Sequence, residues 1–203
     1  MKHRVLWLVV LSLVCTAPAL ARVGSSYRTF RGSEFAKFFS LTVRSRKDLP
    51  AGATLIHLEP GGNQKHIDVE VTTNQSMHTV SAQLSVSREW IGAADSPNQF
   101  ARDIVKSFVA DLACDAADEG LQKVVDDVWH YQGDGAQVVK TAETSAAPAT
   151  AAVAGSTPEL EVFLGRQEHS NRSLKGCSLT FANEKVGESL WLRIRIEQSV
   201  VKP

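Results

Sequence analysis

The sequence is short of cysteine, of any excess of one charge, and of long apolar runs. Its 203 residues include three Cys, and 22 Lys and Arg balance 22 Asp and Glu. Proteins that bind nucleic acid or anionic membranes carry a clear excess of basic residues, so the balance argues against both classes. Beyond the N-terminus no apolar stretch approaches the roughly 20 residues that cross a bilayer. We therefore expect no membrane span after the leader described below.

Catalytic motifs are missing as well. The sequence contains no nucleophile elbow, no zinc-protease pair of histidines and no Cys-x-x-Cys. Gly133-Asp134-Gly135 begins like a dinucleotide fingerprint, but Val138 stands where the third Gly belongs. The end of a helix explains both glycines. We therefore expect a non-enzymatic protein, with no catalytic residue, bound metal or cofactor.

Residues 1–21 have the pattern of a cleavable signal peptide. A short basic head, Lys2-His3-Arg4, precedes an almost unbroken apolar run of about ten residues between positions 5 and 14. The small-x-small sequence Ala19-Leu20-Ala21 then supplies a signal peptidase site. We expect cleavage after Ala21 and an extracytoplasmic location, in the bacterial periplasm or secreted.

The mature chain has one pair of cysteines. Cys15 falls within the leader, which leaves Cys114 and Cys177. An even pair in an oxidising compartment predicts a disulfide, here closing a loop of 63 residues. The alternative is a reactive thiol assisted by a histidine, but neither cysteine has a nucleophile signature around it. We expect Cys114 and Cys177 to be bonded.

The first part of the mature chain predicts an antiparallel β-meander. Apolar and polar residues alternate with a period of two, and turn sequences such as Pro60-Gly61-Gly62-Asn63 separate the alternating segments. This pattern is typical of strands with one buried face. The four predicted strands cover residues 38–44, 54–59, 66–72 and 78–87.

The periodicity then becomes helical. Ser96, Pro97 and Gln99 predict a helix start, with Ser as the N-cap, Pro at the first helical position and Gln completing a capping box. Two apolar stripes at spacings of three and four predict two helices, the second ending at Gly133-Asp134-Gly135. The first stripe is Phe100, Ile104, Val105, Phe108 and Leu112, and the second is Leu121, Val124, Val125, Val128 and Trp129.

A compositional break follows the helices. Residues 141–158 are rich in Ala, Thr and Ser, are interrupted by Pro and Gly, and lack an apolar stripe. This composition predicts a linker or mobile loop. Three further strands are predicted after it, at residues 160–164, 178–183 and 189–198.

The elements together predict an α+β fold. In residues 22–140 an antiparallel sheet packs two helices on its apolar face. After the linker at 141–158, residues 159–203 form a three-stranded β segment that is too small to hold a core alone. We expect this segment to dock on the same domain, either by extending the first sheet or as a second sheet.

One strand carries residues with metal-ligand chemistry. His66, Asp68 and Glu70 alternate and therefore share a face, about 6.5–7 Å apart along the strand. That spacing is too long for three ligands of one ion, so His57 or Glu59 from the facing strand would be required. A solvated sheet face is the alternative, and we prefer it. The set still defines a second function hypothesis, a metal-dependent hydrolase that uses His66, Asp68 and Glu70.

Two segments have the composition of a binding surface. Residues 166–176 predict a polar loop between strands, where binding groups often gather. On the last strand Trp191, Arg193 and Arg195 point outward together, and an aromatic residue beside Arg suits anionic or aromatic contacts. The alternative in both places is a plain solvated surface. We expect a non-enzymatic binding or accessory module, with another extracytoplasmic protein or a small anionic ligand as its partner.

Overall fold

The computed structural model describes residues 21–62, 65–131 and 156–199. These residues form one antiparallel sheet of seven strands, in the order β1-β2-β3-β4-β7-β6-β5, together with six α-helices. The strands are β1 (Thr42–Asp48), β2 (Thr54–Glu59), β3 (Ile67–Thr73), β4 (Thr79–Ser87), β5 (His169–Leu174), β6 (Cys177–Val186) and β7 (Ser189–Gln198). The helices are α1 (Tyr27–Arg31), α2 (Glu34–Phe38), α3 (Arg88–Ile91), α4 (Gln99–Leu112), α5 (Glu119–His130) and α6 (Pro158–Phe163), with a 3-10 turn η1 (Pro50–Gly52).

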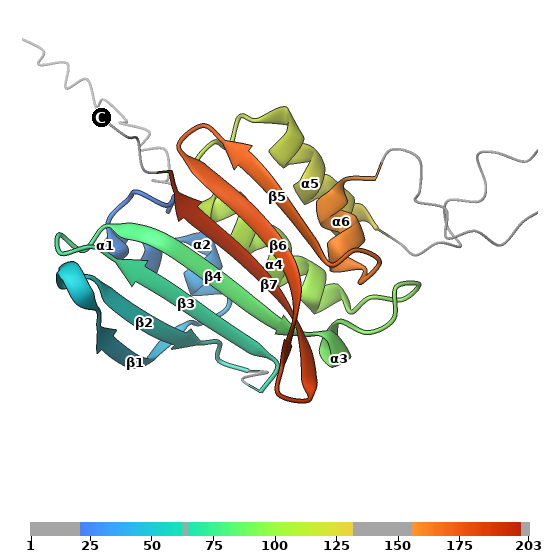
Figure 1. The fold of residues 1–203 in the computed structure, drawn as a ribbon, viewed down its shortest axis with the longest axis horizontal. Coiled ribbons are helices and arrows are strands. Elements are labelled where there is room, and N and C mark those ends of the chain that lie inside the picture. Colours follow the sequence, from blue (N-terminus) through green and yellow to red (C-terminus); the bar gives the residue numbers. More distant parts are fainter. Residues whose placement is uncertain (1–20, 63–64, 132–155, 200–203) are drawn as a thin grey trace, which may run out of the picture.

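The sheet has one covered face and one open face. The helices lie behind the sheet in the view of Figure 1. Along β3 buried and half-buried positions alternate without a break, and Val69 and Val71 have no exposed surface. Helices α4 and α5 turn most of their predicted apolar stripes toward the same core, where Phe108 and Leu121 are almost fully buried. Phe100 is exposed and Trp129 is half-buried. Full burial of one such side chain stabilises the fold by about 1.5–3 kcal/mol. The predicted α+β fold is confirmed.

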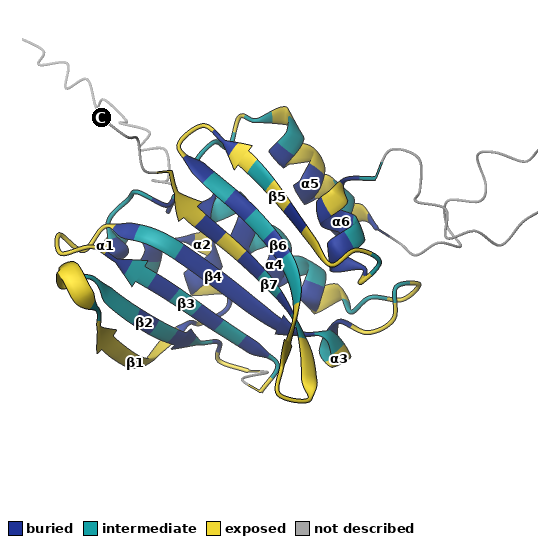
Figure 2. Cartoon of the chain, in the orientation of Figure 1, coloured by how far each residue is buried: buried dark blue, intermediate teal, exposed yellow. Residues whose placement is uncertain are grey.

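The C-terminal strands extend the first sheet. β7 pairs with β4 in antiparallel register, so that Leu84 stands opposite Ile194 and Ala82 opposite Ile196. All four side chains are fully buried. The sequence left open whether these strands extend the first sheet or form a second one. The pairing of β7 with β4 shows that they extend the first. Figure 2 shows the buried positions continuing across the two halves of the sheet.

Several predicted elements appear with little change. β2 and β7 have the predicted bounds, and β3 and β4 each begin one residue later than predicted. Both predicted helices are present as α4 and α5. The start of α4 differs, because Asn98 and not Ser96 is its N-cap, with the Asn98 side chain accepting the Phe100 N–H at 2.9 Å. The predicted helix end at Gly133-Asp134-Gly135 lies outside the described residues.

The predicted strand at residues 38–44 is wrong in its first half. Phe38 is the last residue of α2, and β1 begins only at Thr42, so residues 39–41 connect the helix to the strand. Phe35 and Phe39 are four residues apart, and their rings pack 5.4 Å from each other on the helical side of the core. The alternation of apolar residues at 39, 41 and 43 thus crosses the end of a helix. β1 itself is exposed throughout, as an edge strand without a buried face.

The sequence around the linker is also misassigned. A strand was predicted at residues 160–164, but residues 160–163 belong to α6, which begins at Pro158, and Leu164 is its C-cap. Four apolar residues in a row of five do not distinguish a buried strand from a short buried helix. Residues 156–158 belong to the folded part, and the rest of the predicted linker lies outside the described residues. The predicted loop at 166–176 contains the edge strand β5.

The predicted leader lies almost entirely outside the described residues. Its last residue, Ala21, is 1% exposed and packs into the core. Within the described residues no helix is both long enough and apolar enough to cross a membrane.

The predicted disulfide is present. Cys114 and Cys177 are bonded, with their Cα atoms 5.9 Å apart. Cys114 follows the end of α4, and Cys177 is the first residue of β6. The bond therefore fastens the helical layer to the C-terminal strands, and neither sulfur is a free thiol.

Removal of the disulfide tests this fastening. Replacing both cysteines by serine should lower the free energy of unfolding by about 4 kcal/mol, the loop-closure value for the 63-residue separation. Urea denaturation of the oxidised wild type and the Cys114→Ser, Cys177→Ser variant measures the difference. Wild type in reductant should match the variant. A loss well below about 1 kcal/mol would mean that the bond barely restrains the unfolded chain.

Asp111 on α4 holds the start of α2. Its Oδ2 accepts the Phe35 N–H at 2.7 Å, and Ser33 Oγ accepts the Ala36 N–H at 3.0 Å. These amides are among the donors that the first turn of a helix leaves without a partner. Burial raises the pKa of Asp111, an effect that the Phe35 hydrogen bond opposes and the charge of Glu34 reinforces.

Two substitutions of Asp111 separate the hydrogen bond from the charge. Asp111→Ala removes the acceptor and should destabilise the protein by about 1 kcal/mol. Asp111→Asn keeps an oxygen acceptor and removes the ionisable group. A raised pKa in the folded state favours folding at low pH, and this contribution is lost as pH rises through the folded pKa. Relative to wild type, Asp111→Asn should therefore be more favourable at pH 7 than at about pH 3. Urea denaturation at both pH values tests this order, and it would be contradicted if the difference between Asp111→Asn and wild type were the same at both.

Candidate functional site

The open face of the sheet carries a row of polar side chains across four strands. The backbone register sets His57 on β2 opposite Glu70 on β3, and Glu70 opposite Gln83 on β4. Gln83 in turn stands opposite Arg195 on β7. Side chains that are directly opposite in an antiparallel pair have Cβ atoms about 4.5–5.5 Å apart. The sheet therefore brings residues from both ends of the chain into one contact row.

Gln83 is the centre of this row. Its Oε1 accepts hydrogen bonds from Arg195 Nε at 3.1 Å and Nη2 at 2.6 Å. Its Nε2 lies within donor distance of Glu70 Oε2 at 3.3 Å and Ser85 Oγ at 3.4 Å. Although it lies on the open face, Gln83 is only 7% exposed, and it contacts Glu70 on one side and Arg195 on the other. The row is thus a hydrogen-bonded network with a buried amide at its middle.

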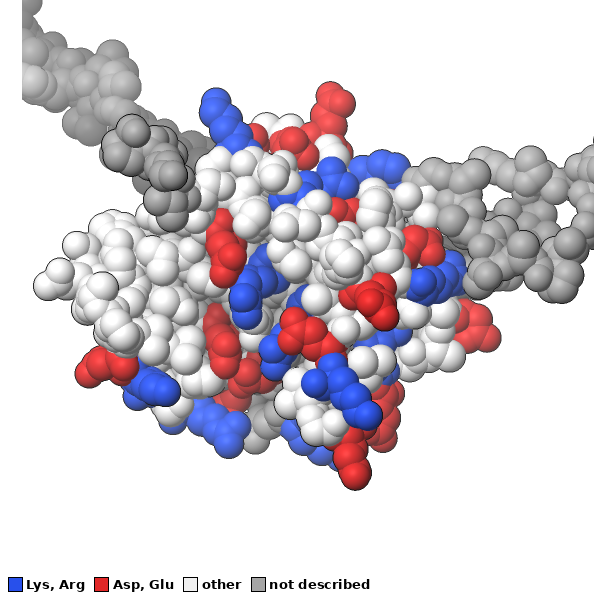
Figure 3. Space-filling view, viewed as in Figure 1, with Lys and Arg blue, Asp and Glu red and all other residues white. Residues whose placement is uncertain are grey.

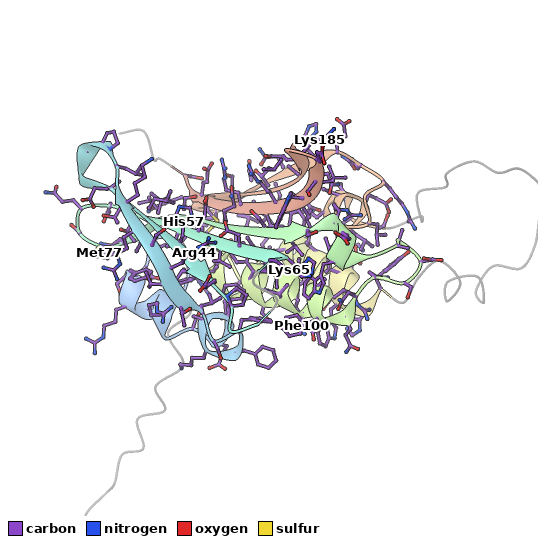
Figure 4. The ribbon with its side chains drawn as sticks, turned by 90° about the horizontal axis from the view of Figure 1, so that it is seen from below. Arg44, His57, Lys65, Met77, Phe100 and Lys185 are labelled. Atoms are coloured by element: carbon purple, nitrogen blue, oxygen red, sulfur yellow. A yellow bond between two sulfur atoms is a disulfide. The ribbon has the colours of Figure 1, made fainter. Side chains whose placement is uncertain are left out.

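At the β2 end of the row, an imidazole and two carboxylates come together. His57 Nδ1 lies 3.2 Å from Glu70 Oε1, and both side chains are less than a third exposed. Ligand atoms of His57, Asp68 and Glu70 all lie within 4.8 Å of one another. Burial raises the pKa of Asp68 and the charge of Glu70 raises it further, while His57, Arg44 and Arg193 oppose the rise. Figure 4 labels His57 on β2 and Arg44 on the neighbouring strand.

His66 is not part of this cluster. It precedes the first residue of β3, and its ring stacks on Trp90 with the centroids 6.0 Å apart and the planes at 9°. The predicted set of His66, Asp68 and Glu70 is therefore brought together only in part, and His57 takes the place of His66. His57 was one of two ligands predicted from the facing strand, with Glu59 as the other. The hydrolase function itself stays a hypothesis.

The predicted row Trp191, Arg193 and Arg195 lies on the open face, while Leu192 and Ile194 between them are fully buried. Arg193 forms an ion pair with Glu184 on β6 at 2.6 Å. Arg195 lies 3.7 Å from Glu197 and also donates hydrogen bonds to Gln83. Trp191 is half-buried, opposite Ser87 on β4. Figure 3 shows basic and acidic side chains next to each other over the middle of this face. The surface is polar and of mixed charge.

The edge of the sheet at β5 carries a second polar region. Arg172 makes a bidentate pair with Glu159, through Nε to Oε1 at 3.1 Å and Nη2 to Oε2 at 3.0 Å. Glu159 is 2% exposed, so the pair holds α6 against β5. The predicted polar loop is therefore in part a strand with a structural ion pair. A shallow hollow beside the pair is also lined by Pro158, Gln167 and His169.

We found no family model, curated protein or solved structure that matches this chain.

The network makes Gln83 a sensitive position for stability. Gln83→Leu keeps the size of the side chain but leaves Arg195 and Glu70 without their shared partner. Each of these two groups still reaches water, so the expected loss is about 1 kcal/mol. Urea denaturation measures it, with Thr180→Val, opposite Arg195 on β6, as a control on the same face. An equal or smaller loss for Gln83→Leu than for Thr180→Val would show that the network adds nothing to stability.

Proposed function

We propose that this protein is an exported, non-enzymatic binding module that captures another extracytoplasmic protein on the open face of its sheet. The observation that carries the proposal is the polar row from His57 to Arg195, which continues to the half-buried Trp191 on β7. Helices cover the opposite face of the sheet, so the two faces have different environments (Figure 1). A rigid sheet with a preordered polar face suits recognition without catalysis.

Two features support export. The first is the signal-peptide pattern of residues 1–21. The second is the Cys114–Cys177 bond, since disulfides persist in oxidising compartments and are rare in the cytosol. The two features are independent of each other, because one lies in the leader and the other in the folded part.

The charge pattern supports a protein partner over a small anionic ligand. Arg193 and Arg195 are each paired within the face, to Glu184 and to Gln83. A small anion would have to displace these partners. A protein surface can pair with both signs at once and can cover Trp191, and buried Trp with neighbouring Arg is enriched at interface hot spots.

Partner capture by variants tests the proposal. The purified oxidised protein is immobilised, and proteins captured from the secretory compartment of the source are compared between wild type and Trp191→Ala. The truncation should weaken capture of the same partner by roughly tenfold or more, because hot-spot residues contribute about 2 kcal/mol or more. Trp129→Ala on α5, on the helical side, is the matched control and should leave capture unchanged.

A thermal melt of each variant completes the experiment. Trp191→Ala should unfold within a few degrees of wild type. Recovery of the same partners by Trp191→Ala would show that the open face is the wrong surface. Loss of capture by Trp129→Ala alone would move the interface to the helical side.

A further inference from the structure

The cluster of His57, Asp68 and Glu70 brings one imidazole nitrogen and two carboxylate oxygens within 4.8 Å of one another on the open face. In the part of the chain that the structure describes, no other group of three His, Cys, Asp or Glu side chains meets the same spacing. The strands hold these residues in place, since His57 and Glu70 are register partners and Asp68 lies two residues along β3. The backbone positions of all three are therefore set by the sheet and not by a loop.

The spacing of the donor atoms fits a small ion. Zn²⁺ binds imidazole nitrogen and carboxylate oxygen at about 2.0–2.2 Å, so two of its ligands at a tetrahedral angle lie about 3.4 Å apart. His57 Nδ1 and Glu70 Oε1 are 3.2 Å apart. One ligand atom of Asp68 lies within 4.8 Å of a ligand atom of His57 and of a ligand atom of Glu70. No change of strand register is needed to form the site.

Gln83 orients the Glu70 carboxylate. Its amide contacts Oε2 at 3.3 Å, while Oε1 faces His57. Hydrogen-bonded partners of this kind fix ligand orientation in metal sites. Arg44 and Arg193 also act on the charge of Asp68, and the Arg193 guanidinium is paired with Glu184 at 2.6 Å.

We propose that His57, Asp68 and Glu70 bind one divalent transition-metal cation of the zinc type, with water completing its coordination. A nitrogen donor with two carboxylates favours such an ion over Ca²⁺ and Mg²⁺, which prefer oxygen ligands alone. The site goes beyond the proposed function, because it binds the ion whether or not a partner occupies the face.

Calorimetric titration with Zn²⁺ tests the site. The protein is oxidised, full-length after export, free of any affinity tag and stripped with a chelator. Wild type should bind one Zn²⁺ per chain at this site, and His57→Ala and Glu70→Gln should each weaken it about tenfold or more, since loss of an outer partner alone weakens metal sites 10–100-fold. His66→Ala is the matched control, a histidine from the same β2–β3 hairpin that stacks on Trp90, and should bind as wild type does.

The outcomes separate the site from other histidines and from misfolding. No stoichiometric binding by wild type, or equal weakening by His66→Ala and His57→Ala, overturns the proposal. Zn²⁺ should raise the melting temperature of wild type and of His66→Ala but not of Glu70→Gln. The melting temperature of Glu70→Gln without metal is the control that this variant is folded. A shift of the same size with Ca²⁺ would overturn the zinc-type assignment. Partner capture in the presence of chelator distinguishes failure of this site from failure of the proposed function.

Discussion

The pairing of β4 with β7 is the constraint on which the rest of the structure depends. β4 ends the N-terminal meander and β7 is the last described strand, so their ladder joins segments separated by the helices and by residues 132–155. On the covered face the ladder sets Leu84 against Ile194, and on the open face it sets Gln83 against Arg195. One register thus determines both the continuity of the core and the polar network.

The disulfide supports the same pairing from the helical side of the sheet. Antiparallel ladders between distant segments form late and at an entropic disadvantage, because a long loop must close first. Cys114 and Cys177 join the end of α4 to the start of β6, which neighbours β7. The bond shortens the effective loop between the meander and the C-terminal strands. It therefore favours the β4–β7 pairing without taking part in it.

Local patterns in the sequence predicted the elements better than their connections. β2 was predicted to the residue because turn residues flank it on both sides, and β7 because it alternates cleanly along its length. Residues 38–44 and 160–164 were misassigned because short apolar segments fit a strand and a buried helical turn equally well. The fold class survived these errors, since it depends on the long alternating strands and on α4 and α5. The pairing of β4 with β7 left no local signal, so the number of sheets could not be predicted.

The candidate site shows the same limit at the level of side chains. Alternation along β3 correctly grouped Asp68 with Glu70, because residues two apart share a face. It also grouped His66 with them, although the chain leaves the strand there and the ring stacks on Trp90. His57 and Gln83 reach the carboxylates across the sheet, from β2 and β4, and such contacts follow from register, not from spacing along one strand. Within the row Glu70 contacts both of its neighbours, since one of its oxygens faces His57 and the other contacts Gln83. The row therefore depends on the register of four strands, and Trp191 takes no part in its hydrogen bonds.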